Sequence, residues 1–235
     1  MEVSADSLAS YVAGVVACPA FTQTFADELN TPGVRVPLTA DPDLWSKACL
    51  QGEDVIWAST FGERFVDDAH ARNFGDVLFP QGDGRRIVCE KDIGAEVPGA
   101  MTYDEDKKVI NLGLGSFGPV TPAMWEYDVG GNNVLRKWFG YRKALPDGKK
   151  TSPLDHVHVA TWPLDWITEF MEVLSVLRRL TDLHEQQADT LAAILAGAVI
   201  SVSDLSSELV LPVPESARQV RSAASVSPIQ QSIFE

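Results

Sequence analysis

The sequence predicts an α+β fold with N-terminal helices, a central mixed or antiparallel sheet and a C-terminal helical pair. Apolar residues recur at helical spacing through the first 60 residues, and this spacing returns after residue 163. Between these regions, short extended runs are separated by glycine-rich and polar turns. The chain has 235 residues, of which 45% are hydrophobic and 22% charged, so it can bury a substantial core.

Three helices are expected in the N-terminal part. The first begins near Ser4, where Ser4 or Asp6 can serve as the N-cap. Pro19 suits the first turn of a second helix, which ends before the NTPG turn. A short extended segment at 34–38 precedes a third, longer helix over 41–62.

Short strands are expected in the central part. Residues 66–86 are polar and rich in glycine, which indicates a surface excursion before the first strand. The runs RRIVCE and MTYDEDKKVINLGLG, and the segment around WEYDVGG, have the composition of short strands. The polar YDEDKK between Met101 and Val109 favours a hairpin turn.

Helical spacing returns in the C-terminal part. Its inward stripe comprises Trp166, Ile167, Phe170, Met171, Leu174, Leu177 and Leu180. We expect a break near His184 and then a second helix that ends at Gly197, a residue suited to a helix C-terminus. Residues 1–210 are therefore expected to form one domain, with 211–235 as a small and polar tail.

The segment NLGLGSFG at 111–118 contains the spacing G-x-G-x-x-G. In dinucleotide-binding proteins this spacing joins a strand to a helix whose N-terminus binds phosphate. Here Pro119 and Pro122 follow at once and disfavour such a helix. We therefore interpret these glycines as a turn between strands, and we expect no nucleotide site there.

Cysteine use and hydropathy indicate a soluble, cytoplasmic protein. Cys18, Cys49 and Cys89 are far apart and odd in number, which favours reduced thiols over a disulfide framework. The acidic N-terminus does not resemble a signal peptide. No apolar run approaches the roughly 18 residues of a membrane helix, so no membrane partner is expected.

The sequence carries no recognised catalytic motif. It lacks a nucleophile elbow, a P-loop and a kinase-type catalytic loop. In DHVH, His156 and His158 would share one face of a strand and could bind zinc together with a remote carboxylate. Two ligands do not complete a zinc site, so ordinary loop histidines are the preferred interpretation. We expect no catalytic residue, metal or cofactor in this chain.

Positive charge is concentrated in one segment of an otherwise acidic chain. The net charge is −14, and residues 1–60 contain eight acidic and two basic residues. Residues 134–150, called the basic segment below, contain six basic residues and one acidic residue. Such a segment is either a solvated face or a place where an anion docks.

Contact with nucleic acid is the functional interpretation of the basic segment and of the two asparagines before it. Lysine and arginine contact phosphates, and asparagine and arginine can pair with the edges of adenine and guanine. The alternative is that Trp125, Leu135, Trp138 and Phe139 are core residues and that the basic side chains are merely solvated. The candidate DNA-binding residues are Asn132, Asn133, Arg136, Lys137, Arg142, Lys143, Lys149 and Lys150.

Several blocks of sequence, in order, resemble the C-terminal specificity region of Type ISP restriction–modification enzymes. They are YVAGVVACPAFTQTFADELNTPGVRVPL, WASTFGERF, PVTPAMWEYDVGGNNVLRKWFGYRK, SPLDHV and WPLDWITEFMEVLSVL. The resemblance spans about residues 7–205, and it reads STFG at 59–62 where HTFG or HTYG is expected. It implies recognition of double-stranded DNA beside an adenine-specific methyltransferase domain or subunit, which would bind S-adenosylmethionine.

The expected function is that of a DNA target-recognition module for phage defence. The N-P-P-Y-type motif of the methyltransferase is absent, so adenine methylation or cleavage would be carried out by other domains or subunits. The alternative is an acidic protein–protein interaction subunit of a phage-defence complex without direct DNA contact. The net charge of −14 favours this alternative, and the basic segment opposes it.

Overall fold

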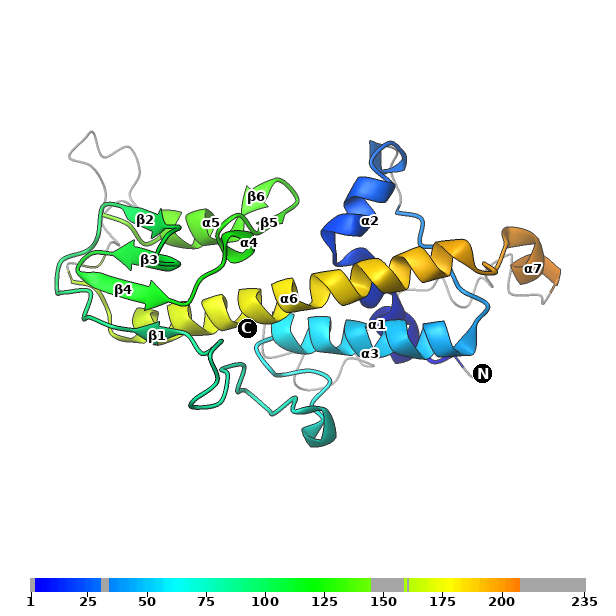
Figure 1. Cartoon of the computed structure of the whole chain (residues 1–235), viewed down its shortest axis with the longest axis horizontal. Helices are drawn as coiled ribbons and strands as arrows, with labels where there is room; N and C mark the ends of the chain where they lie inside the picture. Colours follow the sequence, from blue (N-terminus) through cyan, green and yellow to red (C-terminus); the bar gives the residue numbers. More distant parts are fainter. Residues whose placement is uncertain (1–2, 31–33, 145–158, 160, 208–235) are drawn as a thin grey trace, which may run out of the picture.

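The computed structural model describes residues 3–30, 34–144, 159 and 161–207. The described part is built along α6 (Asp165–Ala196), a helix of 32 residues. Figure 1 shows α6 running through the molecule, with three N-terminal helices along its C-terminal half and a sheet beside its N-terminal half. We call these two regions the helical part and the sheet part.

The helical part contains α1 (Ala5–Val16), α2 (Pro19–Thr24) and α3 (Pro42–Ser59). Polar caps set where two of these helices begin. The Ser4 hydroxyl accepts a hydrogen bond from the Ser7 backbone, and the Asp41 carboxylate caps α3 in the same way. These starts confirm the sequence predictions. The second helix is shorter than expected, because it ends at Thr24 and a 3-10 helix, η1 (Glu28–Asn30), follows.

α1 and α3 lie very close together because glycines face each other across their contact. A Cβ atom on Gly14 would overlap the backbone oxygen of Ala48, and one on Gly52 would overlap the backbone oxygen of Ser10. α6 completes the arrangement, since the Gln187 amide donates a 2.9 Å hydrogen bond to the Gly14 carbonyl. A larger residue at either glycine would force the two helices apart.

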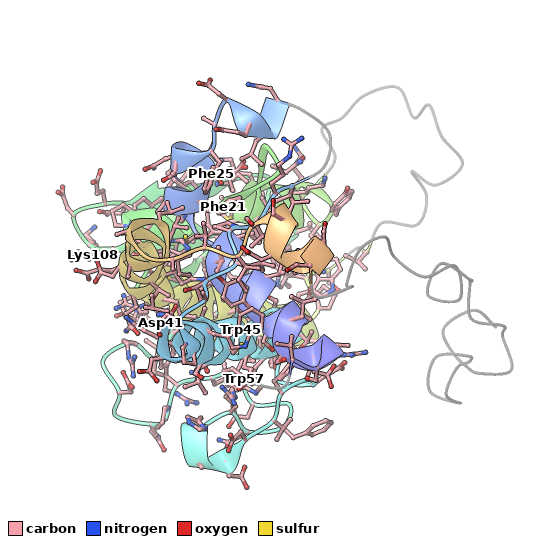
Figure 2. All side chains as sticks on the ribbon, turned by 90° about the vertical axis from the view of Figure 1, so that its right-hand side faces the viewer. Phe21, Phe25, Asp41, Trp45, Trp57 and Lys108 are labelled. Carbon is pink, nitrogen blue, oxygen red and sulfur yellow. The ribbon has the colours of Figure 1, made fainter. Side chains whose placement is uncertain are left out.

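An aromatic pair forms the centre of the helical part. The ring of Tyr11 stacks on Trp45 with ring centroids 4.2 Å apart, and the Tyr11 hydroxyl donates to the Pro37 carbonyl at 2.7 Å. Figure 2 places Trp45 where α1 and α3 meet. The other buried members are Val15, Cys18, Phe21, Ala48, Leu191 and Ile194. This cluster fixes the C-terminal half of α6 to α1, α2 and α3.

The sheet part contains β1 (Val88–Cys89), β2 (Met101–Asp104), β3 (Val109–Leu112) and β4 (Gly115–Gly118). All pairings are antiparallel, and the strand order is β1-β4-β3-β2. Asp104 pairs with Val109, so residues 105–108 form the turn that the sequence predicts. The antiparallel alternative for the central sheet is therefore confirmed.

Four small elements connect the sheet to α6. They are α4 (Pro122–Trp125), β5 (Asp128–Val129), β6 (Asn132–Asn133) and α5 (Val134–Gly140). The core beneath them joins sheet and helix, since Phe170 of α6 packs edge-on against Phe117 of β4 at 4.9 Å and stacks on Trp138 of α5 at 4.6 Å. The N-terminal half of α6 is thus held by the sheet part.

Residues 66–86 contain one short element, the 3-10 helix η2 (Asp68–His70), and they are not only a surface excursion. The Arg72 side chain is 4% exposed and forms ion pairs with Glu53, Asp54 and Asp67. Val77 and Phe79 of this segment are also buried. A polar sequence can lie inside here because carboxylates of α3 neutralise the arginine that enters.

The expected break near His184 is wrong, although the α+β class is confirmed. α6 continues through His184 to Ala196, and its end at Gly197 agrees with the sequence. The segment LHEQQ at 183–187 is polar. It contains no glycine or proline, however, and the half-buried His184 stacks on Tyr127.

The C-terminal helical pair is therefore one long helix followed by the short α7 (Val202–Ser207). Residues 211–235 lie outside the described part of the chain, so the boundary of the polar tail stays a prediction. No helix within the described ranges is long and apolar enough to cross a membrane.

Candidate nucleic-acid interface

The β5–β6 hairpin carries the first two candidate DNA-binding residues. Asp128 pairs with Asn133 and Val129 pairs with Asn132, which leaves Gly130–Gly131 as a two-residue turn. The φ angles of these glycines are +58° and +78°. Positive φ at both central positions is what a type I′ hairpin turn requires. The sequence VGGNN therefore folds as a tight hairpin at the surface.

Asn133 joins this hairpin to α5. Its side-chain oxygen accepts a 2.9 Å hydrogen bond from the Arg136 backbone and so caps α5. Its amide nitrogen donates to the Trp125 carbonyl at 2.7 Å. The Val134 backbone also donates to the Tyr127 carbonyl at 3.0 Å. Both ends of the Asn133 side chain are used within the protein, so this residue positions the hairpin and the helix relative to each other.

α5 has one apolar face and one charged face. Leu135, Trp138 and Phe139 are buried in the core of the sheet part. Arg136 and Lys137 are exposed between them. Leu135, Trp138 and Phe139 are therefore core residues, as the alternative interpretation predicts, and Arg136 and Lys137 lie on the opposite, solvent-facing side. Contact of these cations with nucleic acid stays a prediction.

Asn132, Arg136 and Lys137 form the exposed polar surface. The Lys137 amino group donates to the Asn132 side-chain oxygen at 3.2 Å, and the Asn132 amide donates to the Gly130 carbonyl at 3.1 Å. The Arg136 guanidinium pairs with Glu126 at 2.9 Å and lies over the Trp125 ring, 5.5 Å from its centroid. Arg136 is thus partly neutralised, whereas Lys137 is bound only to a neutral amide among the described residues.

Arg142 turns inward rather than toward solvent. Its guanidinium pairs with Glu169 of α6 at 2.6 Å and donates to the Trp138 carbonyl at 3.1 Å. It also lies 4.4 Å from the centroid of the Trp138 ring and 5.3 Å from that of Trp166. This arginine connects α5 to α6, a role that the sequence did not indicate.

The remaining candidates lie at and beyond the end of α5. Lys143 is exposed, and no carboxylate of the described residues lies within 4.0 Å of its amino group. Lys149 and Lys150 fall outside the described residues, as do His156 and His158 of the alternative zinc site. No group of three or more metal-ligating side chains comes together within the ranges described.

An aromatic contact lies beneath the hairpin. Tyr127, between α4 and β5, stacks on His184 of α6 with ring centroids 5.8 Å apart. Burial raises the pKa of the Tyr127 phenol and lowers the pKa of His184. Both shifts favour the neutral form of each ring, as expected for two half-buried rings that pack against each other.

The glycine-rich motif at 113–118 is a turn and not a phosphate cradle. Leu112 pairs with Gly115, so Gly113 and Leu114 turn the chain between β3 and β4, and Gly115 is the first residue of β4. Added Cβ atoms on Gly113 and Gly115 would come within 3 Å of Ile93 atoms. The space above the motif is therefore already filled by the protein, and the interpretation of these glycines as a turn is confirmed.

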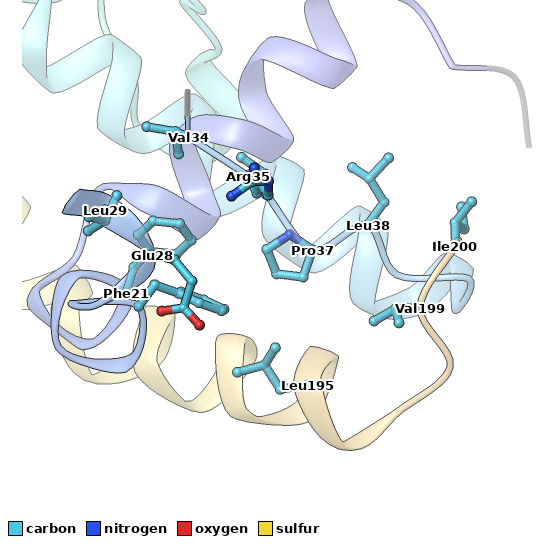
Figure 3. A pocket seen from close by; sticks show the side chains of 12 residues that line it. Phe21, Glu28, Leu29, Val34, Arg35, Pro37, Leu38, Leu195, Val199 and Ile200 are labelled. Atoms are coloured by element: carbon cyan, nitrogen blue, oxygen red, sulfur yellow. The ribbon is translucent and has the colours of Figure 1, made fainter. Parts of the chain in front are cut away.

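The described structure also has an apolar pocket of about 360 Å³ in the helical part, shown in Figure 3. α2, η1, the extended segment 34–38 and the end of α6 surround it. Backbone hydrogen bonds close one side, from Ala40 to Ala198 and from Ile200 to Leu38. Phe21, Leu29 and Leu195 contribute apolar surface. No candidate DNA-binding residue lines this pocket.

Sequence reasoning missed Val129 as a surface residue. It is 61% exposed and directly opposite Asn132 in the hairpin. The signal was present, because a glycine pair flanked by valine and asparagine indicates a two-residue hairpin whose neighbouring residues face the same side.

Comparison with models of protein families finds a match over most of the chain. The family model described as "Type ISP C-terminal specificity domain" matches residues 1–173, which include the hairpin, α5 and the beginning of α6. No curated protein and no solved structure matches the chain.

Proposed function

The chain belongs to the Type ISP C-terminal specificity domain family, and from this premise we propose that it selects the DNA target of an adenine-specific methyltransferase. A specificity domain gives a restriction–modification enzyme its DNA target recognition. The finer proposal is that adenine methylation or cleavage is performed by other domains or subunits, which bind S-adenosylmethionine.

The observation that carries the proposal is a pair of exposed lysines, Lys137 on α5 and Lys143 just after it, which we call the α5 surface. No carboxylate of the described residues lies within 4.0 Å of the amino group of Lys137 or Lys143. The whole chain carries a net charge of −14, whereas the basic segment that contains these lysines has six basic residues and one acidic residue. Exposed lysines are suited to neutralise phosphates and release counterions.

The candidate residues divide into two roles in this proposal. Lys137 and Lys143, together with Lys149 and Lys150 beyond the described part, contact phosphates. Asn133 and Arg142 act through the contacts that hold the hairpin, α5 and α6 together. Asn132 and Arg136 lie where the phosphate-contacting surface meets the hairpin, and they face the duplex.

A second function is favoured by one observation. Arg136 and Arg142 are both paired with carboxylates, which reduces the positive charge offered by the basic segment. The remaining positive charge of the basic segment would be sufficient for an acidic subunit that binds another protein of a phage-defence complex and does not contact DNA. The salt dependence of duplex binding separates the two functions.

The test compares two double variants in a titration with a mixed-sequence duplex. Lys137→Ala with Lys143→Ala should weaken binding and reduce the log–log salt slope by about 0.9 for each phosphate that is no longer neutralised. The control is Lys47→Ala with Arg64→Ala, which removes two exposed positive charges from the helical part and its following turn.

The control variant should keep the affinity and the salt slope of the wild type, measured with the chain or its methyltransferase complex. If both variants behave like the wild type, the α5 surface does not bind DNA and the acidic interaction subunit is the better account. An equal reduction of affinity in both variants would instead indicate a general effect of net charge.

A further inference from the structure

The two faces of the β5–β6 hairpin are used differently. One face is bound to the protein, because Asp128 accepts a 2.7 Å hydrogen bond from the Gly131 backbone and Asn133 is bound at both ends. The other face carries Val129 and Asn132. These residues are direct cross-strand partners, so their side chains lie next to each other on the same face.

The free face is exposed and chemically mixed. The Val129 side chain is 61% exposed, although valine is favoured in buried positions, and Asn132 is exposed beside it. The Asn132 amide is held in place by Gly130 and Lys137, at 3.1 and 3.2 Å. An apolar group and an oriented amide thus stand side by side at the surface.

The tip of the hairpin is narrow and unobstructed. Added Cβ atoms on Gly130 and Gly131 would meet no atom within 4 Å. A two-stranded ribbon fits the major groove of B-form DNA, which is about 12 Å wide. Lys137 lies next to the ribbon, where the phosphates that border the groove would come. The shape and the neighbouring charge therefore match a ribbon that enters a groove.

Given the proposed DNA-recognition function, on which this inference rests, we propose that the free face of the hairpin selects an A·T base pair in the major groove. The Asn132 amide pairs with adenine, accepting from the N6 amino group and donating to N7. Val129 contacts the 5-methyl group of thymine. Lys137 moves from the Asn132 oxygen to a phosphate, which leaves that oxygen free to accept from N6.

The acidic residues near the hairpin fit this arrangement. Glu126 is paired with Arg136, and the Asp128 carboxylate is bound to the Gly131 backbone. Neither carboxylate belongs to the free face, because Asp128 pairs with Asn133 on the bound face and Glu126 precedes the hairpin. Val129 and Asn132 on the free face are therefore neutral, and neither of these two carboxylates stands beside them to repel the phosphates.

The experiment begins with selection from a duplex library that contains a block of random base pairs. The wild type should enrich a sequence with at least one A·T pair. Two modified forms of the enriched duplex are then made. In one, the adenine of the A·T pair is replaced by 7-deazaadenine, which lacks the N7 acceptor. In the other, the thymine of the pair is replaced by uracil, which lacks the methyl group. Each replacement should weaken wild-type binding by about fivefold or more.

Matched variants assign each effect to one side chain. Asn132→Ala should no longer respond to 7-deazaadenine but should still respond to uracil, and Val129→Ser should show the opposite pattern. The control is Leu114→Ser, which changes a 75% exposed residue at the tip of the β3–β4 turn and should respond to both replacements.

The outcomes separate this inference from the proposed function. If the two hairpin variants respond to both replacements like the wild type, the hairpin does not read the base pair, while DNA recognition stands. The inference also fails if the wild type binds duplex but enriches no sequence, or enriches one without an A·T pair. If the wild type binds no duplex, alone or with its methyltransferase, the proposed function fails as well.

Discussion

Trp138 connects the surface of α5 to the core beneath it. It is 9% exposed, its indole donates to Glu169 at 2.9 Å, and its ring stacks on Phe170. Trp138→Ala should therefore lower the free energy of unfolding by about 3–5 kcal/mol, because it removes a buried aromatic side chain. Chemical denaturation of the full chain measures this change.

Two further substitutions calibrate that result. Trp138→Phe keeps a ring against Phe170 but loses the hydrogen bond to Glu169, so it should cost about 1 kcal/mol beyond the smaller ring volume. Tyr141→Ala changes an aromatic residue that is 72% exposed and should have almost no effect. A Trp138→Ala variant as stable as the wild type would mean that the indole is not part of the core.

His184 should make stability depend on pH. Burial lowers its pKa below the ordinary value of 6.5. The unfolded chain then takes up a proton at a higher pH than the folded protein does. Stability is therefore complete above about pH 6.5 and is lost as the pH falls through the lower folded pKa. His184→Phe keeps a ring against Tyr127 without a titrating group.

Urea denaturation of both proteins between about pH 5.5 and 7.5 tests this expectation. The free energy of unfolding of the wild type should fall with decreasing pH more steeply than that of His184→Phe. Equal slopes would show that His184 titrates alike in the folded and unfolded states.

At the level of single residues, the sequence predicts positions better than partners. The exposed Lys137 and Lys143 were identified correctly as surface cations from composition. The inward direction of Arg142 could not be predicted, because its partner Glu169 is 27 residues away and comes near only when α6 packs on α5. Local sequence contains no information on that contact.

The contact between α1 and α3 leaves no room for a side chain at its two glycines. Gly52→Ala should separate the two helices, since its Cβ would overlap the backbone oxygen of Ser10. We expect stability to fall by at least about 3 kcal/mol, at the upper end of what overpacking costs, because backbone cannot move aside as a side chain can. Thermal and urea unfolding measure it.

Gly140→Ala is the matched control for this prediction. Gly140 is the last residue of α5, and an added Cβ would meet no atom within 4 Å. Alanine should be neutral or stabilising by up to about 1 kcal/mol, because it lowers the entropy of the unfolded chain. If the two variants are equally stable, α1 and α3 can move apart at little cost.

At the level of elements, predictions succeeded where a local signal marks an end. Ser4, Asp41 and Gly197 sit at the ends of helices and were readable as such. The predicted helix break at His184 is wrong. The polar run there stays helical because Gln187 and His184 contact residues in other parts of the fold. Tertiary contacts outweigh local polarity there.

In the molecule as a whole, α6 is shared by both parts. The sheet part packs on Phe170, Leu174 and Leu177, and the helical part packs on Leu191 and Ile194. Glu185 is exposed and lies in α6 between these two sets of residues. Glu185→Pro should interrupt the helix there and lower the free energy of unfolding by about 3 kcal/mol or more. The wild type should unfold in one thermal transition and the variant in two.

Glu185→Ala is the control and should unfold in one transition near the temperature of the wild type, because alanine is a good helix former. A single transition for Glu185→Pro would mean that contacts outside α6 hold the two parts together.

The sequence was sufficient for the α+β class but not for this arrangement. Alternation and turn residues predict the antiparallel hairpins, since these pairings are local. The placement of both parts along one helix depends on pairs such as Gly14 and Gln187, which are 173 residues apart. Spacing patterns contain no record of such distant pairs.

The double hydrogen bonding of Asn133 has a consequence for the thermodynamics of recognition. Because one side chain fixes both the hairpin and α5, the surface loses its conformational freedom when the chain folds and not when a duplex arrives. Association should then resemble the docking of two rigid bodies, with little ordering entropy to offset the interactions formed. Asn133→Ala would return that freedom to the unbound state. Calorimetry should then measure a less favourable entropy of binding for Asn133→Ala than for the wild type, even where the variant makes the same contacts with the duplex.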